Sequence, residues 1–165
     1  MSTSTTLDAY EDGEPVDQKE YRCMIGSFLY LTAMRPDIHF VVCLCACFQA
    51  SPSTSHRKAL KRIMRYLRFT PEFGLWYSSS SVMSLCGYSD GHFASCLLEC
   101  KSTSGTCQFL GTSLVSWSFR KQSSVALSTI EAKYVAAASC CSQLLWVMAY
   151  LTGFWLGFSS CASSL

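Results

Sequence analysis

Residues 128–134 read Ser128-Thr129-Ile130-Glu131-Ala132-Lys133-Tyr134, and this stretch decides the fold because it opens the longest helix that the sequence predicts. Ser128 is a favoured N-cap residue. Apolar residues then recur at steps of three or four, which is the period of a helix with one apolar face. The face so predicted consists of Ile130, Tyr134, Ala137, Cys141, Leu145 and Met148.

Strand signals precede this helix. The first predicted strand covers 82–90, follows a serine linker at 78–81, and carries Gly87-Tyr88-Ser89-Asp90 at its end. Two further strands are predicted at 103–110 and 114–118, and Gly111-Thr112-Ser113 between them is typical of a hairpin turn. The first strand is thus expected to end in a carboxylate, Asp90.

Helices are predicted in the first seventy residues. Two are expected over 21–32 and about 37–49, separated by Arg35-Pro36-Asp37, because proline cannot continue a helix interior. A third is expected to start at Ser51-Pro52, with serine as the cap and proline in the first turn. The residues predicted to point inward are Tyr21, Met24, Ile25, Phe28 and Leu29 from the first helix, and Leu60, Ile63, Met64 and Leu67 from the third.

The sequence therefore predicts an α+β fold, in which N-terminal helices are followed by a three-stranded mixed sheet packed on a long helix. The expected organisation is a flexible acidic lead at 1–20, a helical region at 21–70, a sheet-and-helix domain at 71–151 and an apolar tail at 152–165. No charged residue follows Lys133, so a membrane-tethered or protein-interaction module using this tail is an alternative function. Polar residues dilute the apolar run and argue against a membrane anchor.

Charge is unevenly distributed along the chain. Six of the eleven acidic residues lie in the first twenty positions, and from Tyr21 onward twelve Lys or Arg stand against five acids. An excess of basic residues after Tyr21 favours an anionic partner, of which nucleic acid is the first candidate. The alternative is an ordinary solvated surface, which has the same composition. The third helix is the candidate nucleic-acid-binding element. Its face opposite the apolar stripe carries Arg57, Lys58, Lys61, Arg62, Arg65 and Arg68.

Eleven cysteines are many for 165 residues. The first ten residues lack the apolar core of a signal peptide, so we expect a cytoplasmic or nuclear protein, not a secreted one. Its thiols should stay reduced and pack as small hydrophobes. No Cys-x-x-Cys pair occurs, which argues against a structural zinc site.

Short motifs follow one another in a fixed order along the chain. They are Tyr21 to Thr32, Arg35-Pro36-Asp37-Ile38, Lys61 to Leu67, Gly74-Leu75-Trp76-Tyr77, Lys101 to Gly105, Val115-Ser116-Trp117-Ser118 and Lys121-Gln122. In this order they resemble the Pol polyproteins of copia-type retrotransposons, in the region between the reverse transcriptase core and the ribonuclease H domain. The likeness runs from about Tyr21 to Trp146. No polymerase palm motif with paired aspartates is present, so reverse transcription is not expected.

The resemblance implies a ribonuclease H-like α/β fold, in which acids from different elements hold two Mg²⁺ ions and the RNA of an RNA–DNA hybrid is cleaved. The first acid matches Asp90 and the second matches Lys133, while Glu131 lies about 200° away around the helix. Asp90 is then the remnant that would hold any metal. No cofactor is expected in this chain, and Mg²⁺ belongs to the ancestral enzyme. We expect Lys133 to pair with Asp90 in place of a metal.

The expected function is that of a degenerate Pol fragment. It is expected to be catalytically inactive and to retain weak binding to an RNA–DNA hybrid, or to other nucleic acid, through the basic helix. An alternative is an active nuclease in which Glu131 replaces the lost acid. The residues after Trp146 resemble neither the family nor a last strand. We expect a frameshift and an early stop to have replaced the third acidic strand there.

Overall fold

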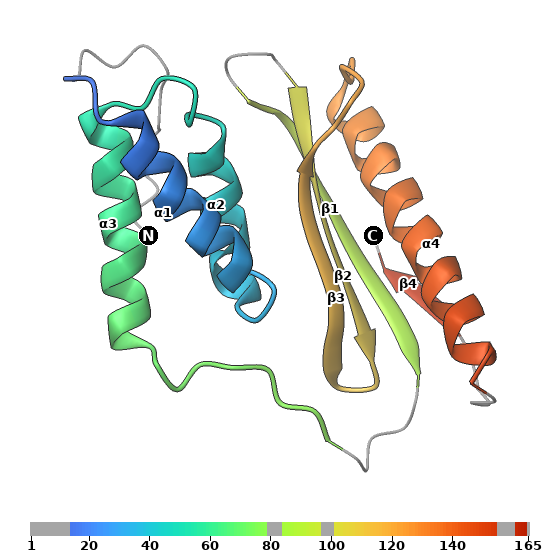
Figure 1. Ribbon diagram of the computed structural model, residues 1–165. Helices are drawn as coiled ribbons and strands as arrows, with labels where there is room; N and C mark the ends of the chain where they lie inside the picture. The colour runs from blue at the N-terminus through green and yellow to red at the C-terminus, as the bar shows by residue number, and fades with distance from the viewer. Residues whose placement is uncertain (1–13, 79–83, 97–100, 155–160, 165) are drawn as a thin grey trace. The chain divides into compact units, whose positions relative to one another are not determined.

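The computed structural model describes residues 14–78, 84–96, 101–154 and 161–164. The chain forms two compact units, residues 1–74 and residues 75–165, each with its own core (Figure 1). Four predicted features fall partly outside the described residues. They are the acidic lead (1–13), the linker (79–81), the start of the first strand (82–83) and the tail (155–160 and 165).

The first unit is built from helices. They are α1 (Gln18–Leu31), the short 3₁₀ helix η1 (Pro36–Ile38), α2 (His39–Ala46) and α3 (Thr54–Phe69). Leu29 and Met64 are 43% and 45% exposed, so the prediction that they point inward is wrong. Both lie at the edge of the buried face of their helix when residues are spaced by 100°. The buried residues of this core are Tyr21, Ile25, Phe28, Ile38, Val42, Cys45, Ala59, Leu60 and Ile63.

Helix α3 begins two residues later than predicted. Its N-cap is Ser53, not Ser51, and the Ser53 amide donates to His56 Nδ1 at 3.0 Å. Ser53 also forms an isolated antiparallel bridge with Pro15, and the His56 ring stacks on Phe48 with centroids 4.2 Å apart. The bridge ties the start of α3 to the segment before α1 and the ring stacking ties it to the turn after α2, which sequence propensity alone does not reveal.

Arg35 connects the elements at the other end of this unit. Its Nε and Nη2 donate to the two carboxylate oxygens of Asp37 at 2.9 and 2.8 Å. Its Nη1 and Nη2 donate to the carbonyl and hydroxyl oxygens of Thr70 at 3.0 and 2.9 Å. The guanidinium also lies 5.8 Å from the Tyr66 ring centroid and 6.0 Å from that of Phe73. One buried cation thus fixes the end of α3 to the turn after α1.

The second unit is a sheet with one long helix. Strands β1, β2 and β3 are antiparallel, and β4 lies parallel to β1 in the order β3-β2-β1-β4. The mixed α+β architecture was predicted, but the number of strands was wrong, because β4 pairs with the edge of β1 that the meander leaves open. Gly111, at φ 61°, makes the predicted hairpin turn. The strands are β1 (Leu85–Cys96), β2 (Lys101–Leu110), β3 (Ser113–Lys121) and β4 (Cys161–Ser164).

Helix α4 (Thr129–Thr152) covers one face of this sheet (Figure 1). The predicted apolar face is not the face that packs on the sheet, since Ile130, Tyr134 and Leu145 are 65%, 69% and 61% exposed and only Met148 of the set packs against the buried cluster. Apolar residues occur on most sides of this helix, so the spacing of apolar residues does not predict which side packs on the sheet. By length and composition alone α4 could cross a membrane, but a core helix meets the same two criteria. The residues it buries are Ala132, Ala136, Cys140 and Leu144.

Candidate functional site

Asp90 lies in the middle of β1, where it pairs with Gly105 of β2. The prediction that the strand ends at Asp90 is wrong, because pairing continues through the next two residues and β1 runs to Cys96. The register is interrupted only after His92, where a bulge follows. Asp90 is exposed. Its carboxylate therefore stands on the surface of a continuous strand.

Gly91 shows which way Asp90 points. A Cβ atom on Gly91 would lie 2.6 Å from the Ala132 carbonyl oxygen and 2.9 Å from the Lys133 nitrogen, so position 91 faces the start of α4. Side chains alternate along a strand. The Asp90 carboxylate therefore projects from the face of the sheet opposite α4, although the backbone of β1 touches α4 one residue later.

Lys133 lies near the start of α4 and is exposed. No ion pair joins it to Asp90, although the structure describes both side chains. The predicted pair is therefore wrong. The physical reason is the alternation of β1, which directs the Asp90 carboxylate away from the helix that carries Lys133.

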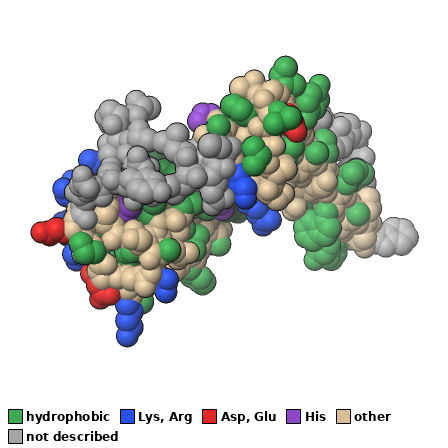
Figure 2. Space-filling model, turned by 90° about the horizontal axis from the view of Figure 1, so that it is seen from above, with side chains coloured by type: hydrophobic (Ala, Val, Ile, Leu, Met, Phe, Trp, Pro, Cys, Tyr) green, Lys and Arg blue, Asp and Glu red, His purple; other side chains and the backbone are tan. Residues whose placement is uncertain are grey.

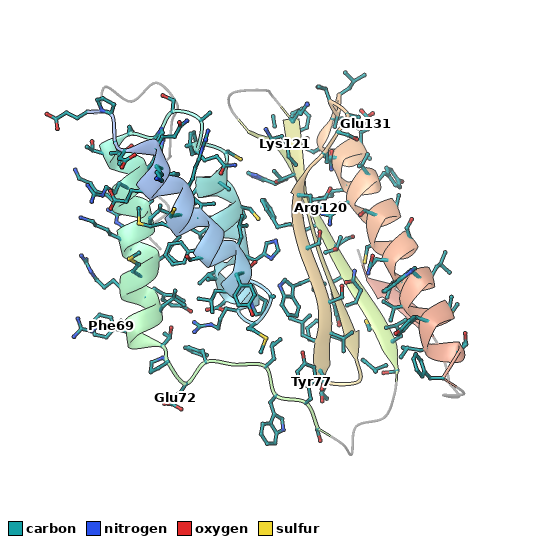
Figure 3. The ribbon with its side chains drawn as sticks, in the orientation of Figure 1. Phe69, Glu72, Tyr77, Arg120, Lys121 and Glu131 are labelled. Carbon is teal, nitrogen blue, oxygen red and sulfur yellow. The ribbon has the colours of Figure 1, made fainter. Side chains whose placement is uncertain are left out.

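Glu131 closes the N-terminus of α4 together with Ser128. The Glu131 amide donates to Ser128 Oγ at 3.1 Å, and the Leu127 amide donates to Glu131 Oε2 at 2.6 Å. Ser128 is thus confirmed as the predicted cap. Figure 3 shows Glu131 at the start of α4 and Lys121 at the end of β3. The Glu131 carboxylate therefore accepts a hydrogen bond at the N-terminus of α4 and helps to cap the helix.

Ser128→Ala is expected to lower the free energy of unfolding of the second unit by about 1 kcal/mol, the usual cost of losing an N-cap. Urea unfolding followed by tryptophan fluorescence reports on this unit, because all four tryptophans come after residue 75. Ser142→Ala is the control, since its hydroxyl donates to the Ala138 carbonyl in mid-helix and its loss should not destabilise. Equal losses in the two variants would contradict the capping role.

Gln122 is a buried polar residue that the sequence analysis did not select. It is 5% exposed, and its Nε2 donates to Ser104 Oγ at 2.8 Å and to the Ala132 carbonyl at 2.9 Å. It ties α4 to β2 beside Gly91, which pairs with Ser104. The signal was its place in the Lys121-Gln122 motif, but a glutamine after a strand predicts no particular contact.

The described residues do not fit a two-metal site. Among them, no group of three or more His, Cys, Asp or Glu residues could hold a metal ion. A pair of Mg²⁺ ions needs several oxygen ligands that converge from different elements. Here Asp90 stands on one face of the sheet, and residue 133 is a cation.

The basic helix α3 carries its charged side chains on the side opposite to the one that packs in the core of the first unit. Arg57 is half-buried and pairs with Glu20, with Nη2 3.0 Å from Oε1. The other five cations, on the side away from the core, are exposed. Figure 2 shows Lys and Arg side chains protruding from the surface of the first unit. The exposed cations of α3 are Lys58, Lys61, Arg62, Arg65 and Arg68.

The cysteines whose side chains the structure describes are free thiols, namely Cys23, Cys43, Cys45, Cys47, Cys86, Cys107, Cys140 and Cys141. Cys45 and Cys140 are buried in the two cores, as expected for small hydrophobes. Burial, with a smaller effect of Cys47, raises the pKa of Cys45 to about 12. Burial also raises the pKa of Cys140 above its ordinary value. These two thiols therefore stay protonated near neutral pH and are poor nucleophiles.

The chain resembles transposon proteins along most of its length. It is 38% identical over 92% of its residues to the "Retrovirus-related Pol polyprotein from transposon RE1" of Arabidopsis thaliana. It is 34% identical over 79% of its residues to the corresponding polyprotein from transposon TNT 1-94 of Nicotiana tabacum. It is also 35% identical to "Secreted RxLR effector protein 161" of Plasmopara viticola, of which it covers 90%. No protein-family model and no solved structure matches it.

These similarities define a transposon-derived protein with a mixed helix-and-sheet fold. The chain belongs to the family of copia-type retrotransposon Pol polyproteins, which confirms the resemblance seen in the sequence motifs. It spans 10% of the length of the two Pol relatives named above. Its ancestry is therefore an enzymatic polyprotein, of which it represents a small segment.

Proposed function

We propose that this chain is the segment of Pol that joins a helical connection region to a ribonuclease H-like domain, and that it does not cleave RNA. The similarity to Pol relatives over most of the chain supports the origin. The order of a helical unit followed by a mixed sheet and one long helix is compatible with it. The positions that the resemblance assigns to catalysis all lie in the second unit.

The cation at position 133 is the observation that supports inactivity. The resemblance expects a second acid at position 133, and the close approach of Gly91 to the Lys133 backbone places this residue against the strand that holds Asp90. The Asp90 carboxylate projects from the opposite face of the sheet, so the two positions do not converge on one metal site, and an ammonium at position 133 would repel a divalent ion rather than hold it. The substitution also removes two oxygen ligands from the site.

An active nuclease that uses Glu131 has less support. Its carboxylate accepts a hydrogen bond from the Leu127 amide at the end of the helix. Residue 131 lies about 200° from residue 133 around the helix axis, so it cannot take the place of residue 133 unless α4 rotates.

We expect the protein to leave an RNA–DNA hybrid intact in both Mg²⁺ and Mn²⁺. The assay is gel electrophoresis of a hybrid whose RNA strand carries an end label, with Asp90→Asn and Glu131→Gln variants run in parallel. Metal-dependent cleavage that disappears in Asp90→Asn would contradict inactivity. Cleavage that persists unchanged in both variants would identify a contaminating nuclease.

The retained function in this proposal is weak binding of nucleic acid by α3. Five exposed cations on one side of a single helix can contact the phosphate backbone without reading sequence. Binding of this kind releases counterions and therefore weakens steeply as salt is added. An RNA–DNA hybrid is the partner that the ancestry suggests.

A further inference from the structure

Phe69 continues the line of cations on α3. Lys58, Arg62, Arg65 and Phe69 stand at positions i, i+4, i+7 and i+11, which places them along one side of the helix. Phe69 is 76% exposed and lies in the last turn. Figure 3 shows its ring projecting from the end of α3. Since it takes no part in the core cluster of the first unit, its position is not explained by packing.

On α3 itself, the surface beside Phe69 is cationic. The sequence of α3 contains no acidic residue, and Arg65 and Arg68 are exposed on the two turns next to the ring. Lys58 and Lys61 extend the charge toward the start of the helix, so the line from Lys58 to Phe69 is about 16 Å long. The nearest following acid, Glu72, lies beyond the helix.

A strand of nucleic acid with unpaired bases complements this surface. Its phosphates match the cations, and the flat face of a base matches an exposed aromatic ring. A duplex offers the phosphates but keeps its bases stacked on one another. A lipid surface fits less well, because the apolar face of α3 is buried in the core of the first unit and cannot enter a membrane.

We propose that the solvent face of α3 binds single-stranded nucleic acid, with Phe69 stacked on an unpaired base and Arg65 and Arg68 on the flanking phosphates. This inference rests on the nucleic-acid binding of the proposed function, and it names a single strand, in place of the hybrid, as the preferred partner. The ring supplies affinity that is independent of salt, and the cations supply affinity that salt removes.

Fluorescence anisotropy of the full chain tests this inference, with one labelled oligonucleotide offered as a single strand and as a blunt RNA–DNA hybrid over a salt series. Phe69→Ala should weaken single-strand binding about tenfold. It should leave the salt slope and the binding of the hybrid unchanged. Arg65→Ala should reduce the slope for the single strand by about 0.7. Tyr30→Ala, which removes an 85% exposed ring from α1, is the matched control and should change neither.

The outcomes separate the two proposals. Single-strand binding that is weakened by Phe69→Ala, but not by Tyr30→Ala, supports the stacking site. Equal binding of both probes that Phe69→Ala leaves unchanged overturns the stacking site and leaves backbone binding by α3 in place. Binding of neither probe overturns both proposals. Attachment to phosphatidylserine vesicles that Phe69→Ala abolishes, without an effect on the single strand, would assign the surface to lipid and overturn the inference.

Discussion

Gly91→Ala is expected to lower the free energy of unfolding of the second unit by about 3 kcal/mol. The added methyl group would lie 2.6 Å from the Ala132 carbonyl oxygen and 2.9 Å from the Lys133 nitrogen. These are backbone atoms of α4, so they cannot rotate away as the tip of a side chain would. The helix would have to move off β1, which also strains the hydrogen bond from Gln122 to the Ala132 carbonyl. Urea unfolding followed by tryptophan fluorescence measures the loss.

Gly105→Ala is the matched control for this prediction. Gly105 pairs with Asp90, next to Gly91 in the same sheet, but a Cβ atom there would meet its nearest neighbours at 3.9 Å. We expect a change within about 0.5 kcal/mol. If Gly91→Ala were no more destabilising than Gly105→Ala, α4 would not lie against β1 as the structure describes.

The sequence predicted elements whose signals are local. Ser128 caps α4 as expected, because a serine side chain satisfies the backbone donor three residues later wherever a helix begins. Gly111 makes the hairpin turn because few other residues adopt its positive φ. The buried face of α4 was predicted wrongly, since Ala132 and Ala136 carry less apolar surface than Ile130 and Tyr134. They are buried because the sheet approaches closely at Gly91, which is a tertiary property.

The sequence predicted which residues belong to the candidate site, but not how their side chains are directed. The motifs placed residues 90 and 133 on two elements expected to be neighbours, and the close approach of Gly91 to the Lys133 backbone shows that these elements touch. The direction of the Asp90 carboxylate depends on strand register, which a single sequence leaves open.

The basic face of α3 could be predicted from helical periodicity. The exposure of Phe69 could not, because an aromatic residue at a helix end is as often buried against a neighbour.

Arg35→Ala is expected to lower the free energy of unfolding of the first unit by about 2–3 kcal/mol. The Arg35 side chain is 10% exposed and donates to both oxygens of Asp37 and to two oxygens of Thr70. Truncation leaves these acceptors without their donor. The loss should fall short of that for a fully buried pair, because the Asp37 side chain is 33% exposed and can regain water. The helical circular dichroism signal measures it together with tryptophan fluorescence, which identifies the transition of the second unit because residues 1–74 contain no tryptophan.

Arg57→Ala is the matched control, because it breaks the Arg57–Glu20 pair, whose side chains are 39% and 46% exposed, and should cost less than about 1 kcal/mol.

Unfolding at low pH separates the contribution of Asp37 to the effect of Arg35→Ala from the contributions of Thr70 and the aromatic rings. The hydrogen bond from Arg35, followed by that from Tyr66, lowers the pKa of Asp37 against the opposing effect of burial. A carboxylate with a lowered folded-state pKa stabilises the fold fully above its unfolded pKa of about 4, and this is lost as pH falls through the folded value. The difference between wild type and Arg35→Ala should therefore narrow below about pH 4. A difference that stayed constant in acid would assign the effect to Thr70 and the aromatic rings, not to Asp37.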